Sequence, residues 1–282
     1  MSGVTFAFLD KLVDFWKARP LMKNGNPIAP DTVLNTLRTC RTFFTWADDT
    51  TWSGWEGPRK LTRPFACERK DLMTASEVRA SATIEQFTVA DLAKLYKAGN
   101  DRDRVIMLTA LFSAGTQMEL SVMTKAEFDL DAGTLDHYRN KTSIRGLFWL
   151  PPELVKLLRA EFKQHPSKPL AFYTREGNAL VTFEGDKKLS DSVLLLWNRL
   201  RIKAEFTEAL PFKYLRKFAG DYATRAGGEA LGQAMLSHAP TSVLGKHYSS
   251  ARDFDALQVA QRQMHAEFTA AGMFDGKPIV KG

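Results

Sequence analysis

The spacing of apolar side chains along the chain predicts a mostly helical protein. In residues 5–18, Phe6, Leu9 and Val13 recur at intervals of three and four, which places them on one face of a helix. The turn-rich segment KNGNPIAP separates this helix from a second one that starts near Asp31. We therefore expect a small helical module at the N-terminus.

The helical pattern then breaks before it resumes in a longer segment. Pro58, Pro64 and a charged run that ends at Asp71 give this stretch the composition of a linker, with one further helix at 74–82. Thr88 can cap the next helix, with Asp91 at its third position. The predicted organisation is a small helical module at 1–57, a basic linker at 58–86 and a larger domain at 87–282.

The period of the pattern changes in the middle of the larger domain. Segments 134–138 and 146–150 read as two strands, and Lys141 and Arg145 lie in the turn between them. Pro151 and Pro152 then begin another helix. Further helical patterns lie at about 102–113, 190–205, 212–226, 229–236, 241–250 and 253–270. The fold class predicted is α+β, mainly helical with a small β-sheet.

Composition and charge favour a polyanionic partner. The chain has 282 residues, 44% of them apolar, which is enough to bury a sizeable core. Its net charge is +7, and basic residues cluster at 59–70 and 199–217. A solvated helix face or linker is the alternative interpretation of each cluster. The candidate DNA-contacting residues are Arg38, Arg41, Arg59, Lys60, Arg63 and Arg145.

Cysteine and histidine usage indicates no metal and no other cofactor. Cys40 and Cys67 are too few for a disulfide framework, no CxxC occurs, and no two of the five histidines have metal-ligand spacing. Charged residues interrupt the N-terminal segment, and the longest apolar run, near 105–115, is too short to span a bilayer. We expect a cytoplasmic protein that does not interact with a membrane.

Three residues near the C-terminus form a set suited to phosphodiester chemistry. Arg216 is followed by His238 after 22 residues and by Tyr248 after a further 10. A guanidinium can hold two phosphate oxygens, and a tyrosine can attack phosphorus if nearby cations and a proton acceptor activate it. Taken singly, each has a structural alternative: an ion pair, a capped or core histidine, and a packed tyrosine.

This order and spacing resembles the C-terminal signature of the tyrosine recombinases, the phage-integrase family. Arg216 matches the arginine of the family's His-x-x-Arg motif, and His238 matches its Leu-Gly-His motif with Ser237 in place of glycine. Tyr248 matches the nucleophile, and Lys141 the hairpin lysine that protonates the leaving oxygen. The resemblance implies that 1–57 is a helical core-binding module that contacts DNA and that 87–282 is a catalytic-type domain. It also implies DNA cleavage without metal or ATP through a 3′-phosphotyrosyl bond.

Two charged family positions are altered. Lys213 replaces the histidine of His-x-x-Arg and keeps a donor and a positive charge. The first catalytic arginine is expected in a Thr-Gly-x-Arg-x-x-Glu context. Counting from Gly115 puts it at Gln117, whereas counting back from Glu119 puts it at Thr116. Neither residue is charged.

The function predicted is site-specific DNA recombination or integration by a tyrosine-type DNA strand transferase of a mobile element. Loss of the first arginine is expected to weaken the catalytic activity unless Arg139 or Arg145 of the hairpin compensates. Double-stranded DNA is the expected partner, and the resemblance implies a homotetramer in the synapse. One alternative is a catalytically impaired DNA-binding regulator or accessory subunit. Another is a helical interaction protein without affinity for DNA.

The terminal helix at 253–270 carries a mostly apolar stripe that includes Phe254, Leu257 and Met264. The resemblance implies that such a helix passes to a neighbouring subunit in the synapse. Packing on its own domain is the alternative.

Overall fold

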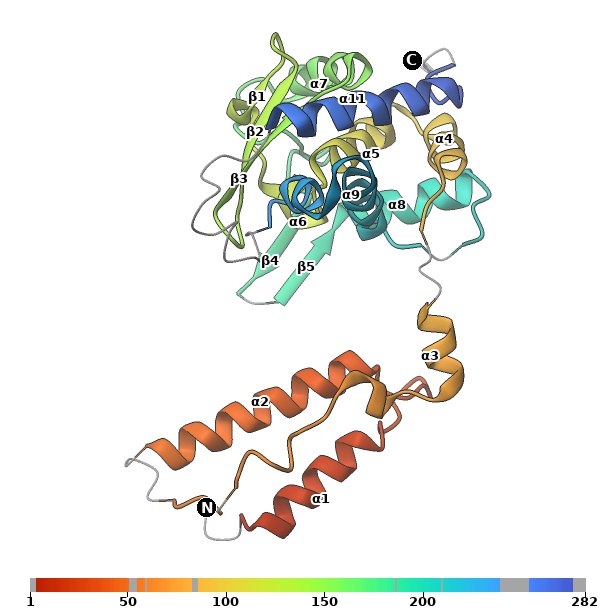
Figure 1. The fold of residues 1–282 in the computed structure, drawn as a ribbon. Helices are drawn as coiled ribbons and strands as arrows, with labels where there is room; N and C mark the ends of the chain where they lie inside the picture. Colours follow the sequence, from red (N-terminus) through yellow and green to blue (C-terminus); the bar gives the residue numbers. More distant parts are fainter. Residues whose placement is uncertain are drawn as a thin grey trace. The chain divides into compact units, whose positions relative to one another are not determined.

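The computed structural model describes residues 4–50, 55–58, 60–82, 86–185, 187–208, 210–238 and 254–275 (Figure 1). The chain forms two compact units, Met1–Ile84 and Glu85–Gly282. Each unit buries a separate cluster of apolar side chains. None of the helices in these described ranges has both the length and the apolar content required to cross a membrane.

The first unit is built on two helices, α1 (Phe6–Lys17) and α2 (Pro30–Asp49). The Thr5 hydroxyl caps α1 by accepting a hydrogen bond from the Phe8 amide, and a proline begins α2. Segment 58–86, expected to be a linker, contains the short helices η2 (Arg69–Leu72) and α3 (Ala75–Ala82). Leu61, Phe65 and Leu72 from this segment are buried in the core of the unit.

Three helices with the same type of N-terminal cap open the second unit. They are α4 (Val89–Ala98), α5 (Asp101–Ser113) and α6 (Gln117–Val122). In each, a Thr or Asn side chain and an Asp or Glu three residues later form reciprocal hydrogen bonds with the backbone. The cap predicted at Thr88 and Asp91 is therefore confirmed.

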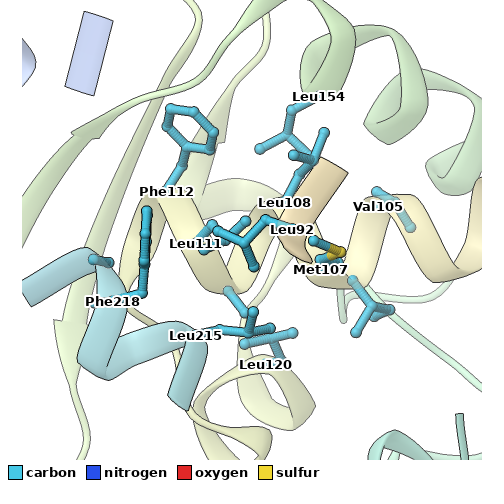
Figure 2. Close-up of a cluster of buried hydrophobic side chains, with 14 of the residues drawn as sticks. Leu92, Val105, Met107, Leu108, Leu111, Phe112, Leu120, Leu154, Leu215 and Phe218 are labelled. Carbon is cyan, nitrogen blue, oxygen red and sulfur yellow. The ribbon is translucent and has the colours of Figure 1, made fainter. Parts of the chain in front are cut away.

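Helix α5 is the centre of the larger core. All its residues from Arg104 to Ser113 are buried, because other elements cover it on every side. Figure 2 shows Leu111 and Phe112 of this helix among side chains that include Leu215 and Phe218 of helix α9 (Lys213–Met235). Helices α7 (Pro152–Gln164) and α8 (Ser192–Lys203) also pack on α5.

Two small antiparallel sheets complete the unit. In the first, β1 (Phe128–Asp129), β2 (Thr134–Arg139) and β3 (Ile144–Trp149) pair in that order, after the short helix η3 (Lys125–Glu127). In the second, β4 (Val181–Glu184) pairs with β5 (Lys187–Asp191). The predicted α+β fold class, mainly helical with small sheets, is confirmed.

The C-terminal part of the unit contains a helix break that the sequence predicts. Gly227 and Gly228 are non-helical within α9, and Gly228 has φ +82°, so the segment bends where separate helices at 212–226 and 229–236 are expected. The helix predicted at 241–250 lies outside the described residues.

The last described helix, α11 (Phe254–Ala270), packs on its own unit, against α9 and β3 (Figure 1). Leu257, Met264 and Phe268 are buried there. The Gln261 side chain is 2% exposed, accepts a hydrogen bond from the Trp149 amide and donates one to the Phe112 carbonyl. In this structure the terminal helix therefore packs on its own domain, which is the alternative to its passage to a neighbouring subunit. The two hydrogen bonds of Gln261 fix the position of α11 along β3.

We predict that Gln261→Leu destabilises the second unit by about 2 kcal/mol or more, because it leaves a buried amide and a buried carbonyl without partners. Urea unfolding combined with hydrogen exchange in β3 measures the loss. The matched control is Gln263→Leu on the exposed side of the same helix. Equal stabilities of the two variants would contradict this role of Gln261.

Candidate functional site

The candidate site is organised by a buried carboxylate at the start of α6. Thr116 is the N-cap residue, and its hydroxyl accepts a hydrogen bond from the Glu119 amide at 3.3 Å. The Thr116 amide in turn donates to Oε2 of Glu119 at 2.7 Å. This reciprocal pair turns the Glu119 side chain back over the helix N-terminus, where the residue is only 7% exposed.

Two arginines from distant parts of the chain lie on this carboxylate. Nε of Arg139, the last residue of β2, is 2.9 Å from Oε1 of Glu119, and Nη1 of Arg216 on α9 is 3.7 Å from Oε2. Burial raises the pKa of Glu119, but the Thr116 amide, the charge of Arg216 and the Arg139 hydrogen bond together hold the pKa below its ordinary value. Glu119 is thus an anion between two cations.

The guanidinium of Arg216 is fixed by backbone carbonyls as well. Nη1 donates to the Ala114 carbonyl at 2.5 Å, and Nη2 donates to the Leu236 carbonyl at 2.6 Å. Burial lowers the pKa of Arg216, Glu119 raises it and Arg139 lowers it again, so that the net shift is downward. An arginine nevertheless remains protonated at neutral pH. The two carbonyls, at the C-terminal ends of α5 and α9, fix the plane of the Arg216 guanidinium.

The structure brings His238 to Arg216. Nε2 of the His238 ring is 3.3 Å from Nη2 of Arg216, and the histidine is exposed. Because an arginine nitrogen only donates, Nε2 must accept in this contact, which requires a neutral ring with its proton on Nδ1. This pair of residues, 22 positions apart in the sequence, is therefore adjacent in space, as the spacing pattern suggests.

Two left-handed residues create this geometry. Ala114 has φ +48° directly after α5, and Ser237 has φ +45° directly before His238. This conformation ends a helix and is adopted most easily by glycine. Ser237 stands where the Leu-Gly-His pattern has glycine, and the backbone here keeps the turn that such a glycine provides.

The β2–β3 hairpin lies against the His238 segment. The Thr142 hydroxyl donates to the Ser237 carbonyl at 3.4 Å. A Cβ atom on Gly146 would lie 2.7 Å from the Ser237 hydroxyl, so the two segments approach too closely for a larger residue there. Lys141, the residue before Thr142, is exposed in the hairpin turn. The turn that carries the candidate lysine is thus held beside the candidate histidine.

The other predicted residues of this unit have different environments. Lys213 is exposed at the first turn of α9, three residues before Arg216 and so on the same helical face. Arg145 makes two hydrogen bonds of 2.9 and 2.7 Å to Asp136 on the exposed face of the hairpin. The side-chain amide of Gln117 donates to the Asp191 carboxylate at 3.2 Å.

The remaining candidates are not brought to this site. Tyr248 and Arg59 lie outside the described residues. Four basic residues of the first unit are exposed: Arg38, Arg41, Lys60 and Arg63. Their roles stay predictions.

The sequence analysis gave Glu119 no role in the site, and it named Arg139 only as one of two hairpin arginines that could compensate for the missing one. The capping signature Thr116-x-x-Glu119 was a readable signal for the first. For the second, the signal was strand alternation: Arg139 is two residues from His137, which is buried.

Comparisons with known proteins identify the fold. No model of a protein family matches the chain, and no curated protein sequence matches it. Among solved structures, the Tn1549 transposon integrase in complex with a circular-intermediate DNA is similar with a TM-score of 0.57 and 16% identity, over 95% of this chain and 86% of that one. A lambda integrase dimer bound to a core site gives a TM-score of 0.53 and 12% identity, over 84% and 80%. The fold is that of the tyrosine recombinases and integrases.

We predict that Ser237→Gly raises the free energy of unfolding by about 0.5–1 kcal/mol, because glycine relieves the left-handed strain at this position. Ser237→Ala, which removes the hydroxyl but keeps the strain, is the control and gains nothing. Urea unfolding of the three proteins measures the difference. A glycine variant no more stable than the alanine variant would contradict the assignment of strain to this residue.

Proposed function

We propose that this chain is a tyrosine-type DNA strand transferase that recombines or integrates DNA through a covalent intermediate at Tyr248. The observation that carries the proposal is the Arg216–His238 contact of 3.3 Å, with Arg216 fixed beside the buried Glu119 carboxylate. The solved integrases of the same fold support it, since the Tn1549 and lambda proteins are described in complex with DNA. Tyr248 follows His238 by 10 residues.

The proposed reaction is an in-line displacement at phosphorus. The Tyr248 oxygen attacks, a phosphotyrosyl bond to the 3′ side forms, and the bond from phosphorus to the 5′ oxygen breaks. Lys141 delivers a proton to that departing oxygen, and the tyrosine proton leaves to a base. His238 is proposed as this base: its neutral ring has one lone pair, on Nε2, which accepts from Arg216 in this structure and takes the tyrosine proton once that contact opens.

Arg216 and Lys213 supply positive charge for the phosphoryl oxygens. The clamp on Arg216 by the Ala114 and Leu236 carbonyls means that the guanidinium does not reorganise when charge develops in the transition state. Lys213 lies on the same face of α9 and takes the place of the family histidine as a donor.

The position of the missing first arginine is proposed to be Thr116. In the Thr-Gly-x-Arg pattern the glycine precedes the arginine by two residues, and Ala114, with its left-handed backbone, precedes Thr116 by two. Gln117 is engaged with Asp191 instead. Loss of one transition-state donor typically slows catalysis by about a hundred- to a thousand-fold, so a weakened enzyme is expected unless another cation substitutes.

A DNA-binding regulator or accessory subunit is the second candidate function. The observation that favours it is the absence of charge at both Thr116 and Gln117. In either case the partner is double-stranded DNA. Assembly of a homo-oligomer, a tetramer in the synapse, belongs to the first proposal. A mobile element as the source of the gene is part of the first proposal.

A nicked suicide substrate with the true recombination site tests the first proposal. The wild-type chain should form a protein–DNA adduct that resists denaturant, and Tyr248→Phe should form none, because only the attacking oxygen is removed. Arg216→Lys should lower the trapping rate by about a hundred-fold or more, since lysine cannot make the planar contacts of a guanidinium.

Arg225→Lys is the matched control for the arginine variant. Arg225 lies on the same helix, is exposed and pairs only with Asp221 among the ion pairs of the described residues, so its replacement should leave the rate nearly unchanged. A footprint on the site with no adduct in the wild-type chain would favour the regulator.

DNA affinity should fall steeply with salt, with log K declining by roughly 0.9 per phosphate neutralised against the logarithm of salt concentration. Replacing Arg59, Lys60 and Arg63 together by alanine should weaken all DNA sequences about equally and make the slope shallower, because backbone contacts carry no sequence code. Fluorescence anisotropy over a salt series measures both. A flat salt dependence would contradict the phosphate-contact role of these residues.

A further inference from the structure

We propose that Arg139 supplies the guanidinium that position 116 lacks and contacts the scissile phosphate together with Arg216. The inference rests on the proposed function, since it assigns a residue to that reaction. It is carried by the position of Arg139 on the same carboxylate, Glu119, that Thr116 caps.

The geometry places the two positions on one anchor. The Thr116 amide is 2.7 Å from Oε2 of Glu119, and Nε of Arg139 is 2.9 Å from Oε1. The backbone of residue 116 and the side chain of Arg139 therefore both contact the Glu119 carboxylate. The Arg139 guanidinium, which comes from the end of β2, and that of Arg216 share the Glu119 carboxylate, on Oε1 and Oε2 respectively.

Strand alternation decides between the two arginines of the hairpin. Leu135, His137 and Arg139 share the inward face of β2, where the first two are buried. Arg145 pairs across the strands with Tyr138, on the opposite face, and bonds Asp136 there. Of the two compensating arginines considered from the sequence, only Arg139 is directed to the Glu119 site.

The charges of the cluster do not cancel. Glu119 contributes one negative charge, whereas Arg139 and Arg216 contribute two positive charges. The two guanidiniums are close enough for Arg139 to lower the pKa of Arg216. One surplus positive charge in a poorly solvated place is unfavourable alone, and a phosphodiester, with one negative charge, balances it.

Arg139 also keeps donors for such an anion. Its bond to Glu119 uses Nε, and within the described ranges no hydrogen bond engages its terminal nitrogens. The side chain is 15% exposed, so that the terminal nitrogens can be reached. Glu119 then acts as the positioning residue that holds the Arg139 guanidinium through Nε, while the terminal nitrogens donate to phosphate oxygens.

The experiment measures the trapping rate on the suicide substrate in the full-length chain. Arg139→Ala should slow trapping by about a hundred- to a thousand-fold, while DNA affinity changes little. Arg159→Ala is the control, because Arg159 is an exposed arginine of α7 that pairs with Asp131. Its rate should match that of the wild-type chain.

Two second-site variants distinguish a catalytic from a merely structural Arg139. If Arg139 only neutralised Glu119, Glu119→Gln would restore the rate of Arg139→Ala by removing the unpaired charge. If Arg139 contacts the phosphate, that double variant stays slow, and Thr116→Arg restores the rate of Arg139→Ala by about ten-fold or more.

The outcomes separate the two proposals. A wild-type adduct together with an Arg139→Ala rate equal to that of the wild-type chain removes the Arg139 inference alone. Rescue by Glu119→Gln without rescue by Thr116→Arg also overturns it. A wild-type chain that forms no adduct on a site shown by footprinting to be bound removes the proposed function and this inference together.

Discussion

The buried Glu119 carboxylate is the interaction on which the candidate site depends. A carboxylate taken out of water is costly unless it is paired and hydrogen-bonded, and Glu119 meets that condition with the Thr116 amide, Arg139 and Arg216. Because each partner comes from a different element, satisfying one charge fixes the start of α6, the end of β2 and the face of α9 relative to one another. The geometry of the cations follows from the need to compensate one anion.

Backbone conformation supplies the second constraint. The left-handed residues Ala114 and Ser237 end α5 and α9 in such a way that the Ala114 and Leu236 carbonyls point at the same guanidinium. The Ser237 turn also presents His238 to Arg216 and receives the Thr142 hydroxyl of the hairpin. Residues that are about 100 positions apart in the chain thus meet through helix ends and one hairpin, all of them anchored on the core around α5.

The sequence was sufficient where a local pattern decides the structure. The apolar periodicity of α1, the cap of α4, the break at Gly227 and Gly228 and the β2–β3 hairpin could all be predicted, because each has a cause within a few residues. The ribbon of β4 and β5 was not expected. Most of its β5 residues are exposed, so no alternation of apolar and polar positions marks it.

The site was predictable only in part, because most of its contacts join residues that are far apart in the sequence. The grouping of Arg216 with His238 came from the resemblance to the recombinase signature. The choice of Arg139 over Arg145 required knowing which face of the hairpin is buried. The place of α11 on its own unit depends in part on Gln261, whose backbone partners, the Trp149 amide and the Phe112 carbonyl, are more than 100 residues away. Tyr248 and the DNA contacts of the first unit remain predictions from the sequence.

The most direct measurement is the structure of the chain bound to a nicked recombination site with vanadate in place of the scissile phosphate, a mimic of the transition state. We expect terminal nitrogens of both Arg139 and Arg216 to lie within hydrogen-bond distance of the vanadate oxygens, about 2.7–3.1 Å, while Glu119 still holds Nε of Arg139. A complex in which vanadate is bound without Arg139, or in which the DNA lies away from the Glu119 cluster, would contradict it.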